Sequence, residues 1–277
     1  MNYDPDDWVF LIPDTGTKAA ERFYGGFVRT TEVIMGRMLP ITISRIAKEK
    51  IEESAIENKI PITNAVNQVM SLLKDLEEIQ QNKDLNLKGA QLALLLVNVA
   101  DNYLAYLCEL VTLILKSKPE ALRSSKTVTL EQVLSFDTIS DFIEEQIESE
   151  VTGLAQKGYK EIKNYFAELN LGLSDSEDDA KSITRVIEDR NLFVHRRGIV
   201  DRRYLRRLTE EGFNTEGIPL GTKLDEWQEL SHVGLTAILK SVLWIDQSAK
   251  LKYSLDEVAL SIAPRLAFSK KQYRESI

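Results

Sequence analysis

Hydrophobic side chains recur every three or four residues over most of this chain, the spacing that places them on one face of a helix. The pattern is clear over residues 63–82, 87–116 and 138–154, and it returns in the last hundred residues. Strand candidates are few and short, at 8–12, 41–44 and 127–130, and none has a hairpin partner with suitable turn residues. The pattern predicts an all-α fold.

Polar and turn residues divide the helical pattern into three parts. The polar stretch QQNKDLNLK, residues 80–88, is the best place for a boundary. We therefore predict an N-terminal helical extension over 1–84 and a helical domain over 85–250. Ser254 and Glu257 have the spacing of a capping box, which predicts a C-terminal helical tail within 251–277. The extension could sense a signal or form a lid, complete the helical bundle, or widen a dimer interface.

The longest apolar stretch, residues 91–115, is long enough to cross a bilayer, but it contains Asp101 and Glu109. An ionised carboxylate near a bilayer centre costs on the order of 3 kcal/mol, so we expect a buried helix of a soluble protein without membrane association. The first residues are acidic, whereas a secretory signal begins with basic ones. Cys108 is the only cysteine, so an internal disulfide is impossible. A cytoplasmic protein is expected.

Charge is distributed unevenly. The net charge is −8, yet Lys181 to Arg207 holds nine basic and three acidic side chains, a balance of +6 that leaves −14 for the rest. Seven of the fifteen arginines lie between Arg190 and Arg207, around one of the two histidines, His195. A guanidinium pairs with phosphate in a bidentate geometry and loses its water more readily than an ammonium. The segment is either a solvated basic helix face or a phosphate-binding surface.

The spacing within this segment limits how its side chains can meet. Asn191 and His195 are four residues apart and share a helix face. Arg190 and His195 are five apart, which separates them by roughly 140° around a continuous helix. They can act on one substrate only if the helix distorts or if a second copy of the chain contributes. A two-fold dimer would bring two identical motifs together.

The run Arg190 to His195, RNLFVH, resembles the Arg-X4–6-His signature of the HEPN superfamily, in the form with a polar residue directly after the arginine. The similarity covers roughly residues 85–250, including the long apolar helix before the motif and the closing helix after it. It is greatest to stand-alone HEPN-like nucleases of bacterial conflict systems. Beyond the histidine it continues at Gly198, Val200, Tyr204 and Leu205. The resemblance implies a helical bundle, usually dimeric, with the two motifs facing each other.

The resemblance also implies an activity, because active HEPN proteins are metal-independent endoribonucleases. His195 would be the general acid or base, Arg190 would stabilise charge on the phosphate, and Asn191 would orient the histidine or the phosphate. Two histidines from two protomers could divide the acid and base roles. The sequence offers no histidine pair or cysteine set for a metal, and no cofactor is expected. The products would carry a 2′,3′-cyclic phosphate or 3′-phosphate and a 5′-hydroxyl.

The implied partner is RNA, either tRNA or mRNA, and the implied setting is a toxin or an antiphage defence effector. A homodimer is expected, with an antitoxin or regulatory partner as a further option. The alternative is a HEPN-like module that binds nucleic acid or a partner without cleaving. Six arginines are the candidates for contacts to the RNA backbone, although some can pair with acids instead: Arg196, Arg197, Arg202, Arg203, Arg206 and Arg207.

Five positions in and around the motif complete the prediction. In HEPN toxins paired with a nucleotidyltransferase, a tyrosine lies two residues after the histidine; here Arg197 stands there, which does not support control by nucleotide transfer. Tyr204 is expected to be a packing residue instead. Glu188 could hold Arg190, but solvation on the helix surface is favoured. Asp101 and its neighbour Asn102 could reach the catalytic groove or be satisfied inside the bundle.

Overall fold

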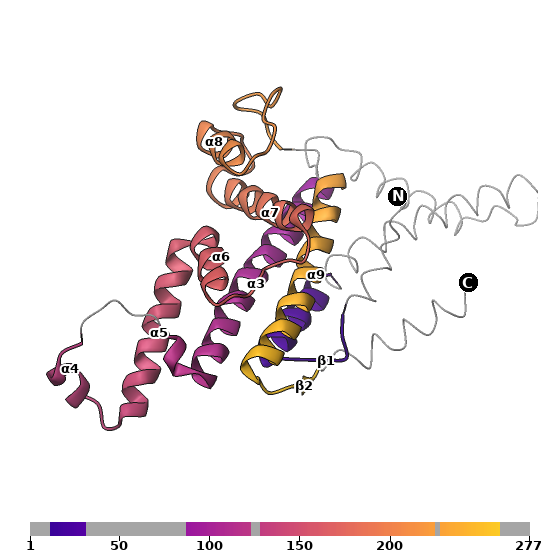
Figure 1. Cartoon of the computed structure of the whole chain (residues 1–277). Coiled ribbons are helices and arrows are strands. Elements are labelled where there is room, and N and C mark those ends of the chain that lie inside the picture. Colours follow the sequence, from indigo (N-terminus) through magenta and orange to yellow (C-terminus); the bar gives the residue numbers. More distant parts are fainter. Residues whose placement is uncertain (1–11, 32–86, 123–127, 225–227, 261–277) are drawn as a thin grey trace, which may run out of the picture. The chain divides into compact units, whose positions relative to one another are not determined.

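The computed structural model describes residues 12–31, 87–122, 128–224 and 228–260, giving only the backbone of 87–92 and 228–232. Two compact units emerge, one of residues 1–28 and 96–277, the other of residues 29–95. Helices dominate, which confirms the all-α class (Figure 1). The helix predicted over 63–82 and the strand candidate at 41–44 lie outside the described residues.

Helix α3, Leu87–Ser117, is the long apolar helix that the sequence predicts. Along it Val99, Tyr103 and Leu107 have no exposed surface. Two of its tyrosines tie it to the long helix α9, Gln228–Tyr253. The Tyr103 hydroxyl lies 2.7 Å from Ser241 Oγ, and the Tyr106 hydroxyl donates to the Val242 carbonyl at 3.3 Å. These paired helices form the core of the larger unit.

Residues Ala93–Ser117 of α3 are long and apolar enough to cross a membrane, by length and composition alone, and half of this apolar stretch is buried inside the protein. That burial is typical of the core helix of a soluble protein. Both carboxylates within the stretch have ion-pair partners: Asp101 pairs with Arg190 and Glu109 pairs with Arg22. The interpretation of this segment as a core helix is therefore favoured by its contacts as well as by its sequence.

Residues 12–28 belong to the same unit as α3 and α9. The Thr17 hydroxyl caps the helical residues 18–31 by accepting from the Ala20 N–H at 3.2 Å, and its own N–H donates to Asp246 on α9 at 3.0 Å. Gly26 faces Asn102 so closely that an added Cβ would lie 2.3 Å from the Asn102 amide nitrogen. Residues 12–28 therefore pack against α3 and α9 within the larger unit.

The segment after α3 contains the short 3₁₀ helix η2, Pro119–Ala121, and then three helices with distinct beginnings. Thr129 and Gln132 form a capping box. A second capping box, between Thr138 and Asp141, begins the following helix. These helices are α4 (Leu130–Leu134), α5 (Ile139–Lys157) and α6 (Tyr159–Glu168).

The remaining helices carry the basic segment and close the bundle. Helix α7, Glu177–Arg196, packs along α9, and α8, Arg202–Glu210, follows it after a sharp turn. The close approach of α7 to α9 depends on Gly234, because a Cβ there would lie 2.1 Å from Val186 Cγ2. In Figure 1, α7 lies beside both α3 and α9.

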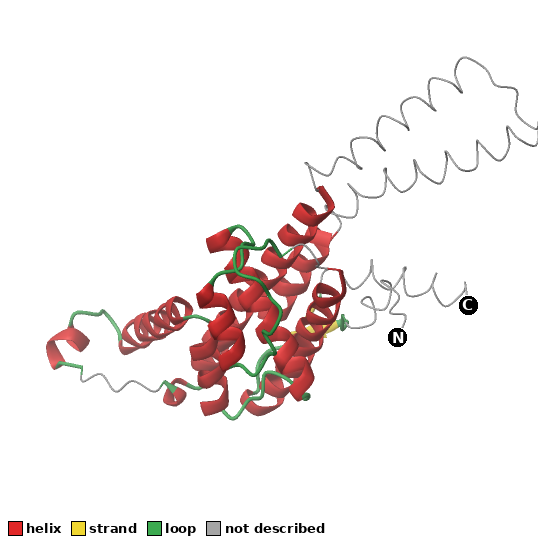
Figure 2. Cartoon of the chain, turned by 90° about the horizontal axis from the view of Figure 1, so that it is seen from above, coloured by secondary structure: helices red, strands yellow, loops and turns green. Residues whose placement is uncertain are grey.

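One short strand pair interrupts the helices among the described residues (Figure 2). Strand β1, Thr15–Gly16, pairs antiparallel with β2, Val258–Ala259. Helix α9 ends at Tyr253, and Ser254 adopts a left-handed conformation with φ of 54°. Glu257 accepts hydrogen bonds from Thr15 and Lys250. The predicted capping box at Ser254 is therefore wrong, because strand pairing captures the residues that would have begun the helix; residues 261–277 lie outside the described part.

Candidate functional site

The candidate site lies on α7, whose sequence determines both ends of the helix. The Ser176 hydroxyl accepts from the Asp179 N–H, and the three acids of the first turn suit the positive end of the helix dipole. The apolar face is buried through Ile183, Val186 and Ile187. This buried face fixes the helix in the bundle. The motif lies in the C-terminal half of the same helix.

The chain reverses direction at Gly198, just after the C-terminal end of α7. Arg197 and Gly198 both have positive φ, 56° and 80°, and an added Cβ at Gly198 would lie 2.6 Å from the Phe193 ring. Asp201 then caps α8 by accepting from the Tyr204 N–H at 2.8 Å. That hydrogen bond, together with Arg196, lowers the pKa of Asp201. The turn places the basic side chains of α8 next to the end of α7.

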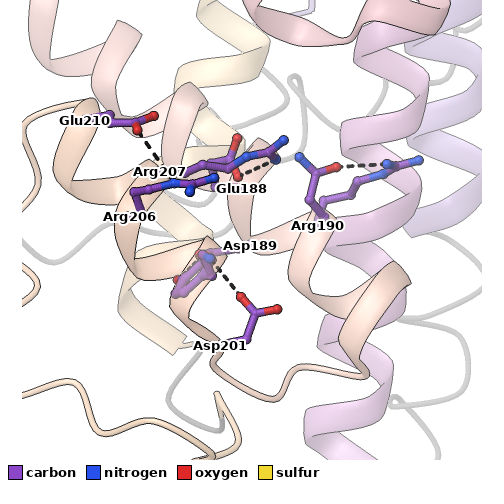
Figure 3. A network of polar contacts seen from close by, with 9 residues as sticks. Glu188, Asp189, Arg190, Asp201, Arg206, Arg207 and Glu210 are labelled. Carbon is purple, nitrogen blue, oxygen red and sulfur yellow. Dashed lines mark hydrogen bonds and ion pairs between the residues drawn. The ribbon is translucent and has the colours of Figure 1, made fainter.

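Arg190 is held by two partners. Its Nε and Nη2 lie 2.6 and 2.5 Å from Asp101 Oδ1 on α3, and its Nη1 donates to Asn191 Oδ1 at 3.1 Å. Figure 3 shows Arg190 on the side of α7 away from Glu188 and Arg207. Asp101 therefore does reach the motif, whereas Asn102 is packed against Gly26. Asn191 orients the arginine through its side-chain oxygen.

His195 lies in the last turn of α7 and is exposed. The helix runs through Arg190 and His195 without a break, so the two side chains leave it roughly 140° apart. Of the two ways considered for bringing them to one substrate, a distorted helix is not observed. Exposed apolar side chains lie beside the histidine in sequence, with Val194 48% and Ile199 46% exposed.

The six arginines considered for RNA contact divide into two equal groups. The paired arginines, Arg196, Arg206 and Arg207, have carboxylate partners: Asp201 at 3.0 Å, Glu210 at 3.7 Å and Glu188 at 3.1 Å. Figure 3 shows the pairs of Arg206 and Arg207. The expectation that Glu188 is merely solvated is therefore wrong. The open arginines, Arg197, Arg202 and Arg203, are exposed, and no acidic side chain of the described residues pairs with them. Arg197 lies at the end of α7, and Arg202 and Arg203 lie at the beginning of α8.

A buried polar cluster next to the motif was missed by the sequence reasoning. Asp189 is 3% exposed and accepts from Arg185 Nε at 2.9 Å and from the Tyr204 hydroxyl at 2.5 Å. Burial raises the pKa of Asp189 to about 6, despite the opposing effect of Arg185. Tyr204 is buried as predicted, and its hydroxyl also ties α8 to α7. The available signal was the four-residue spacing of Arg185 and Asp189, beside the apolar positions Val186 and Leu192.

The described residues contain no group of three or more His, Cys, Asp or Glu side chains placed to hold a metal ion. The site is thus a set of guanidinium groups, one amide and one imidazole at the exposed end of a helix. Such a set can bind a phosphodiester and transfer protons near it. Comparison with protein-family models, with curated proteins and with solved structures found no match for this chain.

Proposed function

We propose that this protein is a metal-independent endoribonuclease of the HEPN type, with an active site formed between two copies of the chain. One observation carries the proposal: the unbroken helix α7 presents Arg190, Asn191 and His195 at the surface, next to the open arginines. An RNA backbone needs cationic contacts along its phosphates and a proton-transfer group at the scissile one. This end of α7 offers both.

The chemistry follows from the side chains. One histidine takes the proton from a ribose 2′-hydroxyl, whose oxygen attacks the adjacent phosphorus, and a second gives a proton to the departing 5′-oxygen. Arg190 neutralises charge that develops on the pentacoordinate phosphate. Imidazole suits both proton transfers because histidine titrates near neutral pH. DNA is spared, since it lacks the attacking hydroxyl.

The direction of the side chains supports the participation of a second copy, because Arg190 and His195 leave α7 on different sides. A two-fold axis near the end of α7 would place His195 opposite His195 of the partner subunit, with Arg190 flanking the shared phosphate. The exposed Val194 and Ile199 would then be covered by the partner. The expected substrate is tRNA or mRNA in the cytoplasm, and the expected role is that of a toxin or antiphage effector restrained by an antitoxin or another regulator.

The decisive test is a time course of purified protein with total RNA and with tRNA in excess EDTA. Wild type is expected to cleave and to leave 2′,3′-cyclic phosphate ends, while His195→Ala is inactive. Because His195 is exposed, this variant should fold normally, which circular dichroism checks. Cleavage by His195→Ala at the wild-type rate would sink the proposal.

A heterodimer tests the composite site. Wild-type and His195→Ala chains carrying different tags can be purified together through both tags. If one phosphate needs a histidine from each copy, the heterodimer is inactive. A site complete within one chain would leave it about half as active as the wild-type homodimer, because one of two independent sites survives.

The alternative is a module that binds RNA without cleaving it. One observation favours it: Arg190 is already ion-paired with Asp101 and diverges from His195 within the chain. This alternative predicts salt-dependent RNA binding by both wild type and His195→Ala, with intact RNA recovered in each case.

A further inference from the structure

We propose that Asp101 is a positioning residue, which holds one edge of the Arg190 guanidinium so that the opposite edge faces the scissile phosphate. This rests on the proposed function of the α7 site. Asp101 lies on α3, 89 residues before Arg190 in sequence, and none of the motif residues themselves supplies the carboxylate.

The hydrogen-bond count supports this role. A guanidinium carries five N–H groups in a planar fork. Asp101 Oδ1 accepts from Nε at 2.6 Å and forms an ion pair with Nη2 at 2.5 Å, and Asn191 Oδ1 accepts from Nη1 at 3.1 Å. These contacts engage three of the five, and they leave one N–H on Nη1 and one on Nη2. Two such N–H groups on the terminal nitrogens can bind two phosphate oxygens side by side. The carboxylate and a phosphate can therefore occupy the same arginine together.

Asp101 is itself firmly placed. Its neighbours Ala100 and Tyr103 are fully buried, and Asn102 packs against Gly26 of the adjoining helix. An unsupported arginine samples many rotamers, and fixing one of them on binding costs entropy. Attachment to a carboxylate on the rigid core helix removes part of that cost before RNA arrives.

The exposure of the pair argues against a purely stabilising role. The side chains of Arg190 and Asp101 are 22% and 47% exposed, so solvent and salt screen their attraction. Ion pairs this open contribute little to folding. The same screening limits the repulsion between Asp101 and an incoming phosphate. A geometric role is therefore favoured over a stabilising or a blocking one.

A double-mutant cycle with Asp101→Ala and Arg190→Ala tests the inference with two readouts. One is the single-turnover cleavage rate. The other is the Kd of fully 2′-O-methylated single-stranded RNA, which binds but cannot be cleaved because its 2′-hydroxyls are blocked. Asp101→Ala is expected to lower the cleavage rate about tenfold when Arg190 is present and to have no such effect when Arg190 is alanine. Asp101→Asn, which retains the acceptor oxygen, should recover part of the loss.

Binding gives an outcome that is independent of catalysis. Removing an acid strengthens RNA binding through charge alone, and the Arg190→Ala background measures that gain. With Arg190 present, the gain in RNA affinity caused by Asp101→Ala should be smaller or reversed. The slope of affinity against salt concentration should stay unchanged in this variant, because the arginine is still there. Glu109→Gln is the matched control, because it removes one charge from the same helix at the ion pair with Arg22.

The result that overturns the inference is an absence of coupling, in which Asp101→Ala has the same effect in both backgrounds. Faster cleavage by Asp101→Ala would also overturn it, and so would a gain in RNA affinity that is larger with Arg190 present than in the Arg190→Ala background. In either case Asp101 would be blocking Arg190. If wild type cleaves no RNA, the proposed nuclease function fails, yet the binding cycle still decides whether Asp101 positions Arg190.

Discussion

Two ion pairs on α7 begin at neighbouring residues and differ in almost everything else. Asp189 pairs with Arg185 inside the protein, where the two side chains are 4% and 12% exposed. Arg190 pairs with Asp101, and there the exposed fractions are 22% and 47%. The buried carboxylate also accepts from the Tyr204 hydroxyl of α8, while the outer guanidinium keeps two N–H groups for a ligand. The difference in burial makes the inner pair a structural contact between two helices and leaves the outer guanidinium accessible to solvent.

The largest predicted effect separates the two pairs by stability. Asp189→Ala leaves Arg185 buried without its carboxylate and should cost about 3–5 kcal/mol of the free energy of unfolding. Asp101→Ala breaks a pair open to solvent and should cost less than about 1 kcal/mol. Urea denaturation of both variants provides the measurement. Equal losses would remove the distinction between a structural and a functional pair.

The second effect is the pH dependence of the inner pair. Because burial raises the pKa of Asp189 from 3.8 to about 6, the folded protein binds an extra proton between these values. The contribution of Asp189 to stability is therefore greatest below about pH 4 and falls as the pH rises to about 6, by on the order of 3 kcal/mol. The stability of wild type relative to Asp189→Asn, measured by denaturation across this range, should decline with rising pH. A rise would show that Arg185 outweighs the desolvation of Asp189.

The third effect concerns the face of α7 that packs against α9 and so fixes the position of both ion pairs. Gly234→Ala should destabilise the protein by about 1–3 kcal/mol, because the added methyl group meets Val186 and separates α7 from α9. Gly153→Ala is the control, since nothing lies within 4 Å of its added Cβ and alanine is the better helix former. Thermal unfolding should show a lower Tm for the first variant and an unchanged or higher Tm for the second.

The smallest predicted effect compares the outer arginines. Changing the open arginines Arg197, Arg202 and Arg203 to glutamine should reduce by about 2 the slope of log affinity against log salt for single-stranded RNA. The same change in the paired arginines Arg196, Arg206 and Arg207 should have less effect, because carboxylates already neutralise them. Fluorescence anisotropy over a salt series measures both. Identical slopes would mean that pairing within the chain does not decide which arginines contact RNA.

The sequence predicted the features that depend on local spacing. The all-α class follows from apolar periodicity, and the starts of α4 and α8 follow from the caps Thr129 and Asp201. The continuity of α7 through His195 likewise follows from its pattern up to Gly198. These signals act within a few residues of chain, so no tertiary contact was needed to recognise them.

The contacts between distant segments were beyond that reasoning. The sequence left open whether Asp101 reaches the motif, and nothing in its spacing identifies Arg190 as the partner 89 residues away. The buried state of Asp189 depends on Tyr204, which reaches it only after the turn at Gly198. The predicted cap at Ser254 failed for the same reason, since β1 supplies a pairing partner from the other end of the described chain.

The pairing of β1 with β2 also bears on when the fold can be completed during synthesis. Thr17 binds Asp246, 229 residues later, and Thr15 pairs with Ala259. Contacts with such large sequence separation form late, because the whole intervening chain must first leave the ribosome. The helix that begins at residue 18 therefore cannot pack against α9 until α9 has been synthesised. If the proposed nuclease acts on RNA in its own cell, this order of assembly keeps it inactive until its synthesis is nearly complete. The ribosomal RNA and mRNA that are producing it are then not cleaved during translation.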